Sequence, residues 1–552
     1  MVSDTLRRQV GQHFVLGFDG LEVTADIRML IQQHHLGSVI LMKRNVQDAT
    51  QVRKLIFDLQ ILAKEAGHEQ PLLIGTDQEN GLVSAFSKAD ALSQFPGAMA
   101  LGATGDPELA ERVYAASAAQ LRLLGVHWAY GPVADVNLDA RNPVIGVRSF
   151  GDDPKNVGAF VAAAGRGMSA SRIASCAKHF PGHGDTHVDS HFALPVISKS
   201  REEMEKAELL PFRNYCDVGE LTTVMTGHMA LPALTGSAEE PASLSKKITT
   251  DLLRGELGFE GVVVTDCLEM DAIANSCGIP SGSVRALEAG ADINMICHTL
   301  AQQVESIEFV CSAVESGKLS LERSAQRIRA LKASLLGSWN DILAEHNASN
   351  WNAKWEKANV DGERVAAEGY AKSVALVQEA GPGIKFPIDV GSTILYTPQP
   401  ESLNRAVDDA EGVQRGKNGT VRNTATASFL SLYNALSQRA PTEHVVYWKN
   451  ETEQASLAGK AIKNLVFVLR NANTSVWQLE VLNKVSKEAE ASGVNVVLLS
   501  CCTPYDLMDA TEPITSYPCL ATFEFTPPAF EAAVSVMFGD ILPRGRVPVA
   551  LK

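Results

Sequence analysis

The chain has 552 residues, a length that predicts more than one domain. Hydrophobic residues make up 45% of it and charged residues 20%, which is typical of a globular protein and excludes a disordered or fibrous one. The net charge of −15 argues against a nucleic-acid partner and favours a neutral or small polar substrate.

The cysteines and the first residues bear on the compartment. The nine cysteines are dispersed and form no Cys-x-x-Cys pair, as expected of free thiols in a reducing compartment. The N-terminus lacks the apolar core of a signal peptide, and no run is long and apolar enough to span a membrane. The sequence therefore predicts a cytoplasmic protein with no membrane partner, and it leaves the oligomeric state open.

Short apolar runs recur through roughly the first 330 residues, each followed by a helix-like stretch such as Glu108–Leu124. Their hydrophobicity is continuous, as expected of parallel strands buried on both faces. Eight β-α units predict a TIM barrel with enlarged loops. The alternative is an open doubly wound sheet, but no Gly-x-Gly-x-x-Gly follows the first run. The expected strands are His13–Phe18, Leu36–Met42, Leu72–Thr76, Val126–Pro132, Ile173–Ala177, Thr222–Thr226, Gly261–Thr265 and Asp292–Ile296.

We assign the expected barrel to residues 1–337. The sequence after it predicts two further parts. Residues 338–366 are rich in Asn, Trp, Lys and Glu and contain no apolar run, which indicates a connector. Residues 367–552 alternate apolar runs with helical stretches such as Val476–Ala491, which predicts a second α/β domain of the layered-sandwich type. Its expected strands are Val374–Val377, Thr393–Tyr396, Val445–Tyr447, Leu465–Leu469 and Val494–Ser500.

Ionisable residues follow several expected barrel strands at their carboxyl ends, where the active sites of such barrels lie. One of them alone could be chance, but several together favour an active face. Asp266 could cap the next helix or point into a cleft as a nucleophile, and the recurrence of polar strand ends favours the cleft. The residues are Asp77, Lys178, His179, His228 and Asp266.

The run from Lys178 to His191 has no periodicity of a core element and predicts a long polar loop. Asp189 lies two residues before His191, and a carboxylate beside an imidazole fixes its tautomer and raises its proton affinity. Such a pair suits general acid/base catalysis near neutral pH. Composition alone favours the simpler interpretation of a solvated loop.

Two irregular stretches contain further candidate binding residues. The four evenly spaced histidines of the Lys178–His191 run would share a helix face, but Pro181, Gly182 and Gly184 oppose a helix, and no cysteine stands at zinc spacing. No metal is therefore predicted there. Arg148 either binds a ligand oxygen or pairs with Asp152, and position alone favours the ion pair.

These segments also resemble a known family. Lys178-His179-Phe180-Pro181-Gly182-His183-Gly184, followed after four residues by Asp189-Ser190-His191, resembles the signature of the β-N-acetylglucosaminidase branch of glycoside hydrolase family 3. Further similar segments occur in family order over most of the chain. They are Asp77-Gln78-Glu79, Arg148-Ser149-Phe150-Gly151, Gly258–Asp266 and the closing Phe538–Pro548.

The resemblance implies a retaining exo-β-N-acetylglucosaminidase that acts on small glycosides through a covalent glycosyl-enzyme. Asp266 would be the nucleophile, and His191, oriented by Asp189, the general acid/base. The implied sugar-binding residues are Asp77, Arg148, Lys178, His179 and His228. No cofactor and no metal are implied, and the partner is a small carbohydrate.

The sequence departs from the family pattern at two positions. Leu82 replaces an arginine near the sugar site, and Cys267 follows the nucleophile where Ala or Asp is usual. Three alternatives stay open: a mixed-specificity β-glucosidase/N-acetylglucosaminidase, a GlcNAc phosphorylase and a catalytically silent sugar-binding protein. The phosphorylase is an alternative because a neutral histidine repels phosphate less than a glutamate does.

Overall fold

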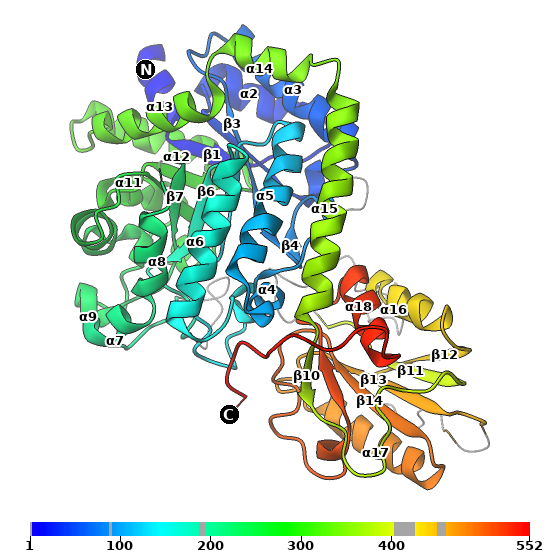
Figure 1. Ribbon diagram of the computed structural model, residues 1–552. Helices are drawn as coiled ribbons and strands as arrows, with labels where there is room; N and C mark the ends of the chain where they lie inside the picture. The colour runs from blue at the N-terminus through cyan, green and yellow to red at the C-terminus, as the bar shows by residue number, and fades with distance from the viewer. Residues whose placement is uncertain are drawn as a thin grey trace, which may run out of the picture. The chain divides into compact units, whose positions relative to one another are not determined.

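The computed structural model describes residues 3–87, 91–186, 194–219, 221–401, 425–449, 457 and 460–551. The chain divides into two compact units (Figure 1). The barrel unit is drawn from residues 1–95, 107–145 and 153–365, and the second unit from residues 96–106, 146–152 and 366–552.

Eight parallel strands form the barrel, and each overlaps one of the eight expected from the sequence. Seven of them follow one another in the order β3-β2-β1-β9-β8-β7-β6. Strand β5 pairs with β3 and meets β6 through bridges at Trp128–Ala174 and Val133–Lys178, which completes the ring. The TIM-type barrel is thus confirmed. Its strands are β1 (Phe14–Leu16), β2 (Ser38–Leu41), β3 (Leu73–Asn80), β5 (Trp128–Tyr130), β6 (Ser175–Phe180), β7 (Thr222–Thr226), β8 (Val262–Cys267) and β9 (Ile293–Ile296).

The barrel interior is a packed core. Val15, Ile40 and Leu73 from three neighbouring strands are fully buried together with Trp128. The indole of Trp128 donates a hydrogen bond of 2.8 Å to the Thr223 hydroxyl, so its polar atom is satisfied inside the apolar core. This filling explains the continuous hydrophobicity of the strands, because side chains on both faces are buried.

Helices cover the outside of the strands (Figure 1). In α5 the buried residues recur at helical spacing, and the helix begins at Pro107, one residue before the expected stretch Glu108–Leu124. In α6 the Asp153 carboxylate accepts from the backbone N–H groups of Lys155 and Asn156 and caps the first turn. The crossover segments in chain order are α2 (Ala25–His34), α3 (Ala49–Glu65), α5 (Pro107–Leu124), α6 (Pro154–Ala170), α8 (Leu209–Cys216), the π-helix η4 (Lys247–Glu256), α11 (Ile279–Ala289) and α12 (Leu300–Glu315).

Shorter elements and a last long helix complete the barrel unit. The short strand β4 (Val83–Ser84) runs antiparallel to the end of β3. The other helices before residue 338 are α1 (Asp4–Gly11), α7 (Arg201–Lys206), α9 (Pro232–Thr235), α10 (Asp271–Ala274) and α13 (Glu322–Leu336), with the short 3₁₀ turns η1 (Lys43–Asn45) and η3 (Ala242–Leu244). Within the described part of the chain, no helix has both the length and the apolar composition needed to cross a bilayer.

Most of residues 338–366, predicted as a connector, is helical: the segment contains α14 (Trp339–His346) and the larger part of α15 (Trp351–Ser373). The Trp351 indole donates to the Leu123 carbonyl at 2.8 Å, and the Arg53 guanidinium lies 4.6 Å from the Trp351 ring centroid. Tryptophan side chains therefore attach this segment to the barrel unit without a continuous apolar run.

The second unit contains a six-stranded sheet. Helix α17 (Trp477–Ala491) lies on one side of it, and α16 (Ala427–Ser437) with α18 (Pro527–Met537) lies on the other (Figure 1). All strands are parallel except β10, which runs antiparallel to β15. The layered α/β arrangement is as predicted. In sheet order the strands are β10 (Ala375–Gln378), β15 (Cys519–Ala521), β14 (Asn495–Ser500), β13 (Asn464–Leu469), β11 (Thr393–Pro398) and β12 (Thr442–Tyr447).

Two early segments of the chain pack inside the second unit. They contain α4 (Ala98–Thr104) and the turn η2 (Gly146–Arg148). Gly102 meets the carbonyl of Phe150 so closely that a Cβ at this position would lie 1.9 Å from the oxygen, and only glycine fits. The Glu524 carboxylate accepts from the Gly97 N–H at 2.9 Å and from the Thr526 hydroxyl at 2.8 Å.

Glu524 should make the stability of the second unit depend on pH. Burial raises the pKa of its carboxyl from 4.5 to about 7, so the folded state favours the protonated form. Protonated Glu524 therefore contributes up to about 3 kcal/mol to the free energy of unfolding. This contribution is fully present below pH 4.5 and is lost as the pH rises through 7. Urea midpoints measured across this range should fall more steeply in the native protein than in E524Q. Equal slopes would contradict the assignment.

Candidate active site

The carboxyl ends of β3, β6, β7 and β8 bring the predicted barrel residues to one edge of the barrel. Asp77 lies in β3, Lys178 and His179 in β6, and Asp266 in β8, while His228 follows β7 by two residues. Because the strands are parallel neighbours in a closed ring, their carboxyl ends face the same side.

An ion-pair cluster fixes the first of these side chains. The Lys178 ammonium lies 2.8 Å from the Asp77 carboxylate and 2.7 Å from that of Glu79. The Lys178 and Glu79 side chains are each 3% exposed, whereas Asp77 is 36% exposed. Asp77 is therefore the member of the cluster that is open to a ligand, and Glu79 is an internal counter-ion. Alternation along β3 places Asp77 and Glu79 on one face, a signal that the sequence contains.

A buried carboxylate orients His179. Asp135 is fully buried, and its Oδ2 lies 2.7 Å from His179 Nδ1. Burial raises the pKa of Asp135, but attraction to His179 and His183 and their hydrogen bonds outweigh this effect, and the pKa lies below its usual value. The resulting carboxylate fixes Nδ1 as a protonated nitrogen of His179. Nε2 is then the ring nitrogen that does not contact Asp135. Asp135 was not among the residues predicted from the sequence, although it follows the expected strand ending at Pro132.

The same carboxylate holds the start of the polar loop. Asp135 Oδ1 accepts from the His183 N–H at 2.7 Å, and the Thr186 hydroxyl lies 3.0 Å from His183 Nδ1. Gly184 passes so close to the Val136 carbonyl that a Cβ there would lie 1.6 Å from the oxygen. The glycine and His183 thus have a structural reason to stand in this run.

Asp266 is the penultimate residue of β8, and its side chain is partly exposed. The N–H of Cys267 donates to Asp266 Oδ1 at 2.7 Å. Burial raises the pKa of Asp266, but attraction to His179 and His228, this hydrogen bond and Lys178 lower it below its usual value. The carboxylate is therefore ionised at neutral pH, as a nucleophile must be.

His228 is fully buried beside this carboxylate. Its Nδ1 lies 2.8 Å from the Ser243 hydroxyl, and its Nε2 lies 3.0 Å from the Cys267 carbonyl. Both ring nitrogens thus have protein partners, which favours a role in positioning the Asp266-Cys267 backbone over direct contact with a sugar.

Of the three remaining predicted site residues, one lies in the second unit and two lie outside the described residues. Arg148 ends the turn η2, which belongs to the second unit, so the structure does not group it with the barrel residues. In that unit the Asp152 carboxylate accepts from the backbone N–H of Ala550 at 2.6 Å. Asp189 and His191 lie outside the described residues, and their approach to Asp266 stays a prediction.

Two other sequence features have a place in the barrel unit. Leu82 is half-buried in the turn between β3 and β4. Among the described residues, one group could hold a metal ion, namely Cys267, Cys297 and His298. It differs from the histidine run, of which His179 and His183 are bound to Asp135.

The barrel part of the chain is similar to a known protein family and to its members. A model of the family described as "Glycosyl hydrolase family 3 N terminal domain" matches residues 5–332. "Beta-hexosaminidase A" of Pseudoalteromonas piscicida is 35% identical over 331 residues, which cover 56% of this chain and 55% of that protein. The chain thus spans about half the length of this relative.

Two solved structures are similar over nearly the whole chain. A fungal multi-domain GH3 beta-N-acetylglucosaminidase, which also has a GCN5-related glucosamine N-acetyltransferase region, is 35% identical with a TM-score of 0.85. The match covers 99% of this chain and 60% of that one. A glycoside hydrolase family 3 beta-N-acetylglucosaminidase from Paenibacillus sp. str. FPU-7 is 32% identical with a TM-score of 0.83, covering 100% of this chain and 99% of that one.

Proposed function

The chain belongs to glycoside hydrolase family 3, and on this basis we propose that it is a retaining exo-β-N-acetylglucosaminidase. The substrates are small glycosides with a terminal β-linked GlcNAc. One observation carries the proposal: burial raises the pKa of Asp266 at the barrel edge, but attraction to His179, His228 and Lys178 lowers it below its usual value, so the carboxylate is ionised. The names of the two relatives with solved structures support the choice of sugar.

In the first step the Asp266 carboxylate attacks the anomeric carbon, and the bond to the leaving oxygen breaks. The Cys267 N–H occupies Oδ1, so Oδ2 is the oxygen available for attack. The product of this step is a covalent glycosyl-enzyme, which an acceptor then releases with net retention of configuration.

His191, oriented by Asp189, is our candidate for the acid that protonates the leaving oxygen and the base that then activates the acceptor. In retaining enzymes the two catalytic groups lie about 5–5.5 Å apart. The loop that begins with His183 would have to bring His191 to the cleft. A loop of this kind couples sugar binding to closure of the site.

The sugar hydroxyls would be bound by Asp77, Lys178 and His179 in the barrel unit. The sugar-binding role of Arg148 stays a prediction from the sequence. Asp77 is fixed by Lys178 and half-exposed, so one of its oxygens can accept from a hydroxyl. His228 would act through the backbone of Asp266 and Cys267. No metal and no organic cofactor take part in this proposal.

The same residues suit a phosphorylase, in which phosphate is the acceptor. An imidazole base is neutral when it accepts a proton, so it repels the phosphate anion less than a carboxylate base would. A mixed specificity for glucosides is the other alternative, because Leu82 replaces a guanidinium near the sugar. A protein that binds GlcNAc without turning it over is the alternative without catalysis.

A panel of aryl glycosides tests these possibilities. Aryl β-GlcNAc should be cleaved faster than aryl β-glucoside, and NMR should show the β-anomer forming first. Faster turnover with phosphate, with a sugar phosphate as product, would indicate the phosphorylase. An α-anomer as first product, or binding without turnover, would overturn the retaining hydrolase.

Replacing His191 with alanine should affect substrates according to their leaving group. Alkyl or chito-oligosaccharide substrates need protonation of the departing oxygen, and their rates should fall by about 10²–10⁴-fold. Dinitrophenyl β-GlcNAc needs no acid, so its glycosylation rate, measured as the burst of dinitrophenolate, should change far less. Equal losses on both substrates would remove His191 from the acid role.

A cytoplasmic location is also proposed from the cysteines. All nine are free thiols. Free thiols are usual in a reducing compartment and uncommon in secreted proteins.

A further inference from the structure

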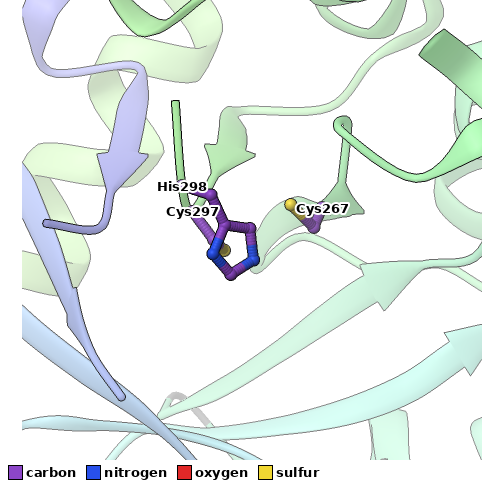
Figure 2. Close-up of side chains that lie close together, drawn as sticks. All are labelled: Cys267, Cys297 and His298. Atoms are coloured by element: carbon purple, nitrogen blue, oxygen red, sulfur yellow. The ribbon is translucent and has the colours of Figure 1, made fainter. Parts of the chain in front are cut away.

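Two cysteines and a histidine meet at the carboxyl ends of β8 and β9. Cys267 is the last residue of β8, and Cys297 and His298 follow β9 directly. Figure 2 shows the two thiols and the imidazole turned toward a common space. One donor atom of each residue lies within 4.8 Å of the others, and no second group of this kind occurs among the described residues.

We propose that Cys267, Cys297 and His298 bind a thiophilic divalent cation of the Zn²⁺ class. Two sulfurs and one imidazole nitrogen form a ligand set that such ions prefer. In a tetrahedral zinc site the donor atoms lie about 3.5–4 Å apart, so small side-chain rotations would bring these three into range. Three protein ligands leave a fourth position for water, as in zinc sites that are not purely structural.

The backbone around the ligands is already fixed by Glu269. Its carboxylate accepts from the N–H groups of Cys297 at 2.8 Å and His298 at 2.7 Å, and from Thr299 at 2.8 Å. The Cys267 thiol lies 3.7 Å from the same carboxylate. Glu269 thus holds the ligand segment in place and supplies a negative charge next to the cation, the role that outer carboxylates have at metal sites.

Access and affinity also follow from the surroundings. His298 is exposed and Cys297 is buried, so a cation can enter from the side of the imidazole. The Arg44 guanidinium lies 3.3 Å from His298 Nδ1 and is itself paired with Asp19 at 2.5 Å. A cation at this nitrogen must displace Arg44, which makes the site weaker than a permanent structural zinc site. This favours reversible binding.

Binding would act on the neighbouring carboxylate. The Cys267 N–H donates to Asp266 Oδ1, so a cation on the Cys267 sulfur would lie one residue from the proposed nucleophile. Its charge would stabilise the carboxylate and oppose attack on the sugar. This consequence, inhibition by the cation, rests on the proposed function, whereas the binding itself does not.

Cd²⁺ is a suitable probe because its bonds to thiolates give an ultraviolet charge-transfer band. We expect the reduced full-length protein to bind one equivalent with this band. Cys267→Ala and Cys297→Ala should each weaken binding by at least about 10-fold. The matched control is Cys277→Ala, which removes a partly exposed thiol of the same unit outside the group and should leave binding unchanged. Absence of the band would overturn the proposal, as would unchanged affinity in the two ligand variants. Weak Cd²⁺ binding of no fixed stoichiometry would indicate an adventitious ion only and would overturn it too.

Activity is measured separately on dinitrophenyl β-GlcNAc. Zn²⁺ should inhibit the native protein, and its inhibition constant should rise at least about 10-fold in Cys297→Ala. One-equivalent Cd²⁺ binding without any hydrolysis would overturn the proposed function and leave the metal site intact. Hydrolysis that Zn²⁺ inhibits equally in both proteins would overturn the link between the site and Asp266.

Discussion

Replacing Asp266 with alanine is expected to lower kcat on aryl β-GlcNAc by at least about 10³-fold, because no group remains to form the glycosyl-enzyme. The carboxylate is ionised at neutral pH and has one oxygen held by the Cys267 N–H. The measurement is steady-state hydrolysis of dinitrophenyl β-GlcNAc, whose leaving group needs no acid. A loss with this substrate therefore reports on attack at the anomeric carbon.

The same variant allows a positive test. Azide can enter the space left by the carboxylate and attack from the same face, which would give the α-glycosyl azide and partly restore turnover. The matched control is Asp251→Ala, which removes an exposed carboxylate of the same unit and should leave kcat unchanged. Full activity of Asp266→Ala, or a β-glycosyl azide, would remove Asp266 from the nucleophile role.

Lys178→Met is expected to destabilise the barrel unit by about 3–5 kcal/mol and to lower kcat/KM at the same time. The substitution keeps the apolar length of the side chain but removes the ammonium shared by Asp77 and Glu79. Glu79, whose side chain is 3% exposed, would lose its contact with the Lys178 ammonium, and its buried negative charge would be less well compensated. Asp77 would lose the contact that fixes its orientation. Urea unfolding measures the first effect, and kinetics on aryl β-GlcNAc measure the second.

A second substitution separates charge from packing. Adding Glu79→Gln to Lys178→Met should recover at least half of the lost stability, because the buried negative charge is gone. Lys206→Met, on an exposed lysine of the same unit, should change stability by less than about 0.5 kcal/mol. If the double variant is no more stable than Lys178→Met, the loss arises from packing and the ion-pair account is wrong.

The barrel strands could be predicted because burial on both faces leaves a clear local mark. All eight expected runs coincide with strands of the closed ring. The short strand β15 was not among the expected strands. Helix α15 was not expected within residues 338–366, because its attachment to the barrel unit through Trp351 involves single aromatic side chains and no apolar run.

The candidate site was only partly predictable, for a related reason. Asp77, Lys178, His179 and Asp266 could be predicted as candidates because each follows the end of an expected strand by one or two residues. Asp135 was missed because its importance lies in contacts with His179 and His183, 44 and 48 residues away along the chain.

By itself, the order of residues determined the alternation of strands and helices, the two α/β parts, the strand-end side chains and the family. These properties follow from local burial patterns and from motifs that are contiguous in the chain. Only the tertiary structure decided which polar side chains meet. These are Lys178 with Glu79, Asp135 with His179, and Cys267 with Cys297 and His298. Such contacts depend on which strands become neighbours when the ring closes. The spacing of residues along the chain does not predict which strands these are.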